Sequence, residues 1–175
     1  MKDLLLELAR ANRFINRTWL EIMSEVPFAT LDENRGAFFE SIFGTLNHIL
    51  LGDRIWLGRL REEPYAFESL RQRLCADLES FKAEREATDA ELIAYVEQVS
   101  DFSRPLEYRS AQGDPFRQPL YEAIHHLFAH QHHHRGQVSQ MCHELKIPIP
   151  DGGLLGYFRQ RGCRRGRLAG PLRSC

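Results

Sequence analysis

The feature that most constrains the fold is a histidine-rich stretch, residues 120–145, which contains seven of the chain's eight histidines. Apolar residues recur along it every three or four positions, which is the spacing of one face of an α-helix. Pro119 stands where a first helical residue tolerates proline, and Pro148 and Pro150 follow the last apolar position. The pattern predicts one long amphipathic helix with these apolar residues on one side: Leu120, Ile124, Leu127, Val138, Met141, Cys142 and Leu145.

Two histidines of this helix are expected on the side turned toward the core. At about 100° per residue, His134 falls on the apolar stripe and His130 on its flank, whereas His125 and His132 point the other way. Histidines four positions apart stand one helical turn from each other on one face, close enough to bind the same metal ion. Two other interpretations stay open: a solvated histidine run, and hydrogen-bonded core histidines. A metal site would need a third ligand from another element.

Length and composition favour one compact domain and argue against several classes of protein. The chain has 175 residues, of which 43% are hydrophobic, and its net charge is −1. This balance gives no electrostatic case for nucleic acid or a membrane surface as a partner, and the apolar runs are too short to span a bilayer. The N-terminal segment has charges where a signal peptide would be apolar. The four cysteines are scattered and form no C-x-x-C pair, so we expect a cytoplasmic protein with free thiols.

Three further helices are expected before the histidine-rich one. Apolar residues at helical spacing predict helices over residues 3–26, 35–61 and 67–99, and Thr88-Asp89 indicates a break or bend in the third. Residues 101–118 contain an alternating segment and a Gly-Asp-Pro turn signal, which predict a short hairpin or an extended crossover. We therefore expect an all-α fold, a four-helix bundle with a short hairpin or irregular crossover before the last helix.

The helix predicted over residues 35–61 is apolar on two sides, which is typical of a helix buried on both. One side carries His48 among small residues, which let a neighbouring element approach closely or leave a cavity. A single core histidine is commonly a satisfied hydrogen-bonding group, so that interpretation stands beside a functional one. Asp53 is expected either as an acceptor behind the site or, with better reason, as an ion-pair partner. The small residues are Ala37, Ser41, Gly44 and Gly52.

Two motifs carry a resemblance to a known family. The second predicted helix contains T-L-N-H followed by D-x-x-W, over residues 45–56, and the last contains H-x-x-x-H-R-G-Q, over residues 130–137. Together they resemble the DinB family, also called DinB/YfiT-like, and the similarity covers roughly residues 1–160. The resemblance implies a four-helix bundle, commonly dimeric, with a divalent metal held by three histidines. By the match these ligands are His48, His130 and His134.

The resemblance also implies a class of chemistry. Three neutral imidazoles leave positions open on zinc or nickel, as a catalytic site requires. Relatives include thiol-dependent S-transferases, so we expect a metal-dependent enzyme of the thiol-dependent transferase or hydrolase type, acting on a small molecule with a low-molecular-weight thiol. The alternative is a non-catalytic metal-binding stress-response protein. No catalytic residue is identified. The candidates for orienting the site are Asn47, Asp53, Gln131 and Gln137. His126 is expected to line a pocket. Arg135 is expected to bind an acidic substrate or, with better reason, to form an ion pair within the protein.

The expected assembly is a homodimer through the first or second helix, because the second has more apolar surface than one bundle face can bury.

The C-terminal segment differs from the rest in having many arginines and glycines and, after Asp151, no acidic residue. Residues 154–158 are expected to pack on the bundle, and residues 161–175 to form a basic, flexible tail. DNA binding by this tail is disfavoured.

Overall fold

The computed structural model describes residues 1–150 and 153–164. Within them the fold is mostly helical, with six helices and one two-stranded sheet, which confirms the expected predominance of helix. The elements follow in the order α1 (Lys2–Ser24), α2 (Phe28–Asp32), α3 (Ile42–Arg61), α4 (Leu78–Gln98), β1 (Pro105–Arg109), β2 (Pro115–Pro119), α5 (Leu120–Glu144) and α6 (Gly153–Arg164).

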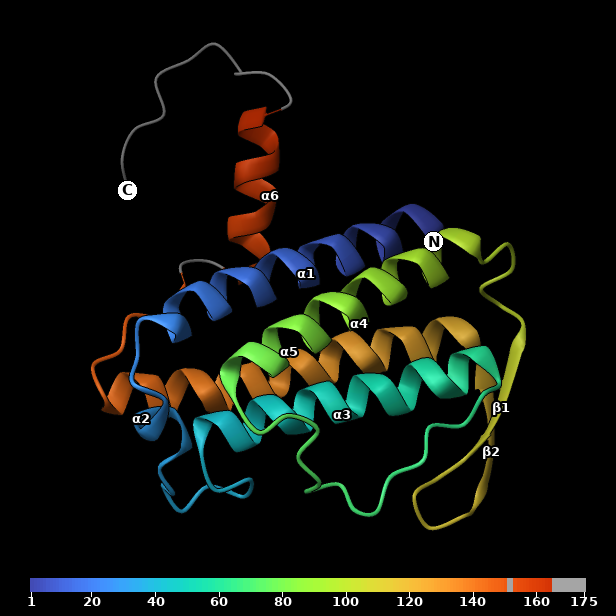
Figure 1. Ribbon diagram of the computed structural model, residues 1–175. Coiled ribbons are helices and arrows are strands. Elements are labelled where there is room, and N and C mark those ends of the chain that lie inside the picture. Colours follow the sequence, from blue (N-terminus) through green and yellow to red (C-terminus); the bar gives the residue numbers. More distant parts are fainter. Residues whose placement is uncertain (151–152, 165–175) are drawn as a thin grey trace.

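The long helices α1, α3, α4 and α5 lie side by side, and the hairpin stands at one end of them (Figure 1). α1 packs along α4 and α3 along α5, and further contacts join α3 to α4 and α1 to α5. Their buried apolar side chains form two clusters. One lies toward the hairpin and includes Leu106 and Ile124; the other lies toward α2 and includes Leu31, Phe43 and Val138. The histidine-bearing helices α3 and α5 are thus direct neighbours.

The start of α3 differs from the prediction, because the helix begins at Ile42 and not at residue 35. The Ser41 side chain accepts a hydrogen bond from the Gly44 N–H at 2.8 Å and caps the helix there. A Cβ atom at Gly44 would lie 2.1 Å from the carbonyl oxygen of Phe39, so only glycine lets the preceding chain approach this closely. Residues 35–41 therefore fold back against α3 instead of extending it.

The start of α4 was also predicted too early, at residue 67, whereas the helix begins at Leu78. The Asp77 side chain caps it by accepting the Ser80 N–H at 2.8 Å. Residues 62–77 form an irregular segment that makes hydrogen bonds to α3. Of the break or bend expected at Thr88-Asp89, a break is wrong, since α4 runs through these residues to Gln98.

The predicted hairpin is confirmed. Strands β1 and β2 pair antiparallel, with Leu106 opposite Gln118 and Tyr108 opposite Phe116. Leu106 is fully buried and anchors the hairpin in the core. Strand β2 leads directly into α5, so Pro119 precedes the first helical residue by one position instead of occupying it.

Helix α6 packs on α1. The Tyr157 hydroxyl donates a hydrogen bond to the Glu7 carboxylate at 3.2 Å, and its ring centroid lies 5.6 Å from that of Phe14. Residues 154–158 thus pack on the helices, as expected. α6 continues to Arg164, past the predicted boundary at residue 160, and the remaining basic tail lies outside the described residues.

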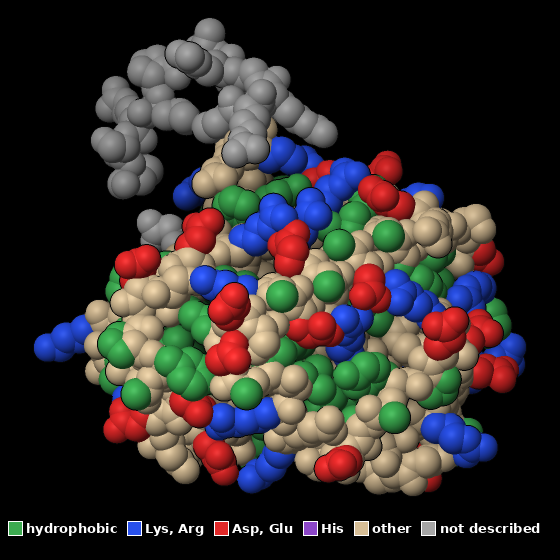
Figure 2. Space-filling view, viewed as in Figure 1, with side chains coloured by type: hydrophobic (Ala, Val, Ile, Leu, Met, Phe, Trp, Pro, Cys, Tyr) green, Lys and Arg blue, Asp and Glu red, His purple; other side chains and the backbone are tan. Residues whose placement is uncertain are grey.

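The surface of the long helices mixes both signs of charge with scattered apolar side chains, as Figure 2 shows for one face. Ion pairs link α4 to its neighbours: Arg17 of α1 pairs with Glu86, and Arg54 of α3 pairs with Glu84 and Glu91. Exposed pairs of this kind contribute little to stability, so the buried apolar clusters carry most of it. None of the helices described here has the length and apolar character needed to traverse a bilayer.

Candidate metal centre

Three histidines from two neighbouring helices converge on one point. His48 comes from the middle of α3, and His130 and His134 come from successive turns of α5. One ring nitrogen from each lies within 4.8 Å of the other two. The ring centroids are 5.0 Å apart for His48 and His130, 4.5 Å for His48 and His134, and 4.4 Å for His130 and His134. The structure thus brings together the three residues that the sequence singled out.

The ring of His48 is fixed on two sides. Its Nδ1 atom lies 2.9 Å from the carbonyl oxygen of Leu70, in the irregular segment before α4. A carbonyl only accepts hydrogen bonds, so Nδ1 carries the proton and Nε2 keeps its lone pair for the site. The ring of Phe39 stacks on the imidazole with centroids 3.7 Å apart. Both contacts come from segments that the sequence had placed in helices.

His134 is oriented in the same way by a neighbour on its own helix. Its Nδ1 atom lies 2.8 Å from the Oε1 atom of Gln137, and donation to that oxygen again leaves Nε2 free. This confirms Gln137 as an orienting residue. Phe39 meets the His134 ring edge-on at 5.5 Å, so one aromatic side chain contacts two of the three histidines.

His130 packs directly on the backbone of α3 at Gly52. A Cβ atom there would lie 2.8 Å from Cε1 and 3.2 Å from Nδ1 of His130. The small-residue face of α3 noted in the sequence is therefore the surface that admits this ring. The Nε2 atom of His130 lies 3.1 Å from Nε2 of His48, and its Nδ1 atom is buried with no hydrogen-bond partner among the described residues. The atom with which His130 faces His48 is therefore Nε2.

Burial keeps all three imidazoles neutral. Desolvation lowers the pKa of His48 to about 4, despite its hydrogen bond to Leu70. Desolvation, followed by the charges of the neighbouring histidines, lowers the pKa of His130 to about 3. The pKa of His134 is also lowered, chiefly by burial. Neutral imidazole is the form that binds metals, so the cluster is ready to ligate at neutral pH.

Asn47 supports the site from behind. Its side-chain oxygen accepts the N–H groups of Leu74 and Cys75, both at 2.9 Å. These bonds hold the irregular segment against α3, and the same segment presents the Leu70 carbonyl to His48. Asn47 therefore supports His48 indirectly, by holding the backbone of residues 70–75 in place. Leu70 and Phe39 were not foreseen, because their part depends on helix starts that the sequence analysis placed too early.

The remaining polar candidates lie in a separate buried network on the other side of α5. Asp53 forms an ion pair with Arg85, as the sequence analysis favoured, and Arg85 also pairs with Asp89. Gln131 and Arg135 face this network and not the histidines, so an orienting role for Gln131 or Asp53 is not supported. No carboxylate among the described residues pairs with Arg135, so the favoured ion pair is wrong. Its guanidinium donates to three amide oxygens, those of Asn12, Asn16 and Gln131.

Of the other histidines, His133 packs edge-on against His134, with ring centroids 4.8 Å apart, but it is not one of the converging ligands. His125 and His132 are exposed, as expected from their place on the helix. His126 packs against Trp56, with ring centroids 5.0 Å apart, and its ring lies 6.1 Å from that of His130.

Two buried cysteines do not offer a ready thiolate. Burial raises the pKa of Cys142 to about 11 and also raises that of Cys75.

Comparison with known families supports the resemblance drawn from the two motifs. The sequence model of the DinB family matches residues 1–149, which contain all three histidines and every element up to the end of α5. A search among curated proteins found no match.

Proposed function

We propose that this chain, which belongs to the DinB family, binds one divalent metal ion through His48, His130 and His134. The observation that carries the proposal is the convergence of three neutral imidazoles, two of which have Nδ1 committed to an acceptor and Nε2 directed away from it. Three nitrogen ligands suit zinc or nickel and leave coordination positions for a small molecule. Within this proposal the four long helices form the four-helix bundle of the family.

We further propose that the protein is a metal-dependent enzyme acting on a small molecule with a low-molecular-weight thiol. A metal in such a site lowers the pKa of a bound thiol or water. The chain's own residues position the histidines and bury the rings of His48 and His134. Gln137 and Asn47, which support the site by hydrogen bonds, carry neutral amides that are not bases, so neither can act as a general base. This favours thiol transfer over hydrolysis, because a thiol needs less help to ionise than water does.

The alternative is a metal-binding stress-response protein without turnover. A site whose remaining positions are filled by further protein ligands would support it. Two further histidines pack beside the cluster, His133 with its ring 4.8 Å from that of His134 and His126 with its ring 6.1 Å from that of His130, but neither belongs to the group of converging ligand atoms. The described residues therefore supply three converging ligands and no fourth, which favours a metal with positions left open.

The test is metal content by mass spectrometry, followed by a thiol-transfer screen, on untagged protein. Wild type should hold about one zinc or nickel per chain, and His48→Ala, His130→Ala and His134→Ala should each lose most of it. His132→Ala is the matched control, because it removes an exposed imidazole from the same helix. Equal metal loss in His132→Ala and His134→Ala would show loose chelation by the histidine run. Wild-type protein with metal but no thiol transfer to any electrophile would favour the non-catalytic alternative.

Assembly as a homodimer and a cytoplasmic location stay predictions. The apolar surface of α3, which suggested the dimer, is largely covered within one chain, since both of its apolar sides are buried. On α1, Leu4 is 59% exposed, so we propose α1 as the interface. Light scattering should give a dimer mass for the wild type and a monomer mass for Leu4→Glu. A monomeric wild type at micromolar concentration would remove the proposal.

A further inference from the structure

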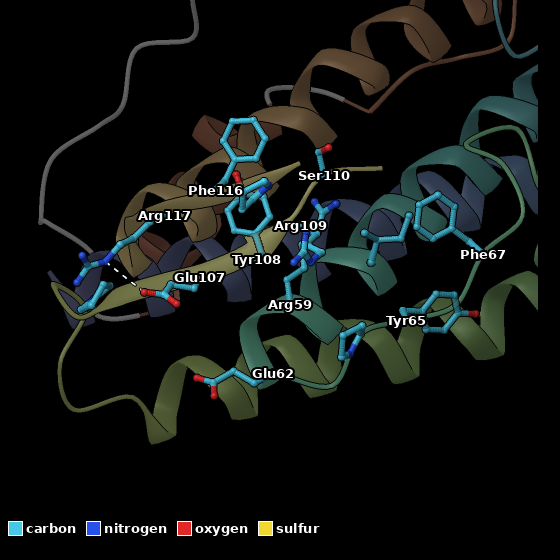
Figure 3. A pocket seen from close by; sticks show the side chains of 14 residues that line it. Arg59, Glu62, Tyr65, Phe67, Glu107, Tyr108, Arg109, Ser110, Phe116 and Arg117 are labelled. Atoms are coloured by element: carbon cyan, nitrogen blue, oxygen red, sulfur yellow. Dashed lines mark ion pairs between the residues drawn. The ribbon is translucent and has the colours of Figure 1, made fainter. Parts of the chain in front are cut away.

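A second candidate ligand site lies at the hairpin end of the molecule. A cavity of about 870 Å³ opens between the C-terminal part of α3, the segment 62–67 and the hairpin (Figure 3). None of the three site histidines lines it. Arg59 lies eleven residues after His48 on α3, which is about 16 Å along the helix axis. The cavity is therefore distinct from the proposed metal site, and its volume falls in the range of small-molecule pockets.

Arg59 is the residue on which the cavity is built. Its guanidinium lies over the ring of Trp56, 4.6 Å from the centroid, and over the ring of Tyr108, 4.9 Å from the centroid. Burial lowers its pKa, but a guanidinium stays charged at neutral pH. Among the described residues no carboxylate pairs with it. Two aromatic rings thus hold a half-buried cation in place, with its hydrogen-bond donors available to a ligand.

The other charges of the cavity leave the balance positive. Glu107 pairs with Arg117 at 3.5 Å, and Glu62 pairs with Arg104 at 3.3 Å, so both acidic side chains of the lining already have a partner. Arg109 also lines the cavity. It donates to the carbonyl of Gly113 in the hairpin turn, and no described carboxylate pairs with it. The lining therefore presents two guanidiniums with unused donors and no free carboxylate.

Aromatic side chains supply the apolar part of the lining. Phe116 stacks on Tyr108 with centroids 5.7 Å apart, yet it is 49% exposed, and Tyr65 on the other wall is 37% exposed. Large apolar side chains left open to solvent around a cavity mark a binding surface. A flat apolar group between the two walls would cover them.

From these observations we propose that the cavity binds a small organic carboxylate with an aromatic body. The Arg59 guanidinium donates two hydrogen bonds to the carboxylate in a bidentate, charge-assisted pair, Arg109 adds positive potential, and Tyr65 and Phe116 contact the ring. Binding here needs no metal, because the cavity and the three histidines share no residue.

The test is calorimetric titration of the full chain with 4-phenylbutyrate and, separately, with its neutral amide. Wild type should bind the acid at least about tenfold more tightly than the amide, because a hydrogen bond to a charged group contributes more binding free energy than one to a neutral group. Arg59→Gln should weaken binding of the acid by a similar factor and leave the amide unchanged. Arg61→Gln is the matched control, because Arg61 is on the same helix and pairs with Glu91 outside the cavity. His48→Ala should bind the acid like wild type, which separates this site from the metal site.

Two results would overturn the proposal. Equal affinity of wild type for acid and amide would show that the cavity does not recognise charge, and this result needs no variant to fold. If Arg59→Gln and Arg61→Gln weaken binding of the acid equally, Arg59 acts only through the net charge of the protein and does not contact the ligand. Circular dichroism and metal content should be the same for Arg59→Gln and wild type, so that lost binding reports the cavity alone.

Discussion

The Nε2 atoms of His48 and His130 face each other at 3.1 Å across the interface of α3 and α5. Two imidazole nitrogens bound to one ion at 2.0–2.1 Å stand about 2.9 Å apart at a right angle and about 3.4 Å apart at a tetrahedral angle. The observed separation lies between these values. The two ligands that belong to different helices are therefore already at coordinating distance, and neither octahedral nickel nor tetrahedral zinc requires α3 and α5 to move.

Gly52→Ala should weaken metal binding without unfolding the protein. The new methyl group would stand 2.8 Å from Cε1 of His130, so the ring must leave its position in the site. We expect metal affinity to fall about tenfold or more, the size of effect seen when the support of a ligand is altered. Competition with a chromophoric chelator measures it.

Gly136→Ala is the control for that substitution, since nothing lies within 4 Å of a Cβ atom at Gly136 on α5. Replacing an interior helical glycine by alanine gains about 1 kcal/mol. This variant should melt higher than wild type with unchanged metal affinity. Equal metal affinity of Gly52→Ala and Gly136→Ala would mean that the His130 ring accommodates the methyl group at no cost to the site.

Gln137→Ala should reduce metal affinity by about 10- to 100-fold, because it removes the acceptor that fixes the tautomer and ring angle of His134. Gln140→Ala removes an exposed glutamine about one turn further along α5, whose side chain donates a hydrogen bond to Glu144 and does not reach the site histidines. Chelator competition on the two variants distinguishes a supporting hydrogen bond from a general effect on the helix. A Gln140→Ala variant as weak as Gln137→Ala would contradict the assignment.

Metal should be retained well below the ordinary pKa of histidine. Burial lowers the pKa of His48 to about 4 and that of His130 to about 3, so protons compete for these nitrogens only in that lower range. Dialysis at pH 7, 5.5 and 4 should leave metal content nearly unchanged at pH 5.5 and reduce it at pH 4. Loss centred near pH 6.5 would indicate solvated ligands.

Asp53 should give the stability of the protein an unusual dependence on pH. Burial raises the pKa of this carboxyl to about 6, although Arg85 opposes the shift. The folded state therefore holds a proton that the unfolded state releases above about pH 4, and the contribution of this group to stability falls as pH rises from about 4 to about 6. The whole effect is about 3 kcal/mol. Urea titrations at pH 4 to 7 give the unfolding free energy of wild type and of Asp53→Asn. The wild-type value minus the Asp53→Asn value should decrease by about 3 kcal/mol over this range. If the two unfolding free energies change with pH in parallel, the raised pKa of Asp53 is excluded.

The sequence predicted those parts of the fold that depend on local pattern. The apolar periodicity of residues 120–145 predicted the C-terminal end of α5 to within one residue. The spacing of His130 and His134 predicted that their imidazoles lie together. The turn signal before Pro115 gave the hairpin. These features depend on residues close in the chain, so one sequence suffices to find them.

The parts that the sequence did not predict depend on contacts between distant segments. Ser41 and Asp77 both cap helices, but each stands in an apolar pattern that continues on both sides, so the pattern alone extended the helices too far. The positions of Phe39 and Leu70 on His48 follow from those caps. The pairing of Arg135 with amides of α1, more than 100 residues away, has no local signal.

On α5, each metal-site histidine is followed by a member of the buried polar network: Gln131 after His130, and Arg135 after His134. A shift of one residue turns a helix by about 100°. If α5 docked one residue out of register, the Arg135 guanidinium would leave its three amide acceptors, and an unpaired charge inside the protein is costly. The network therefore disfavours docking of α5 out of register. The same register turns His130 and His134 toward His48, so one set of buried contacts fixes both the helix and its histidines.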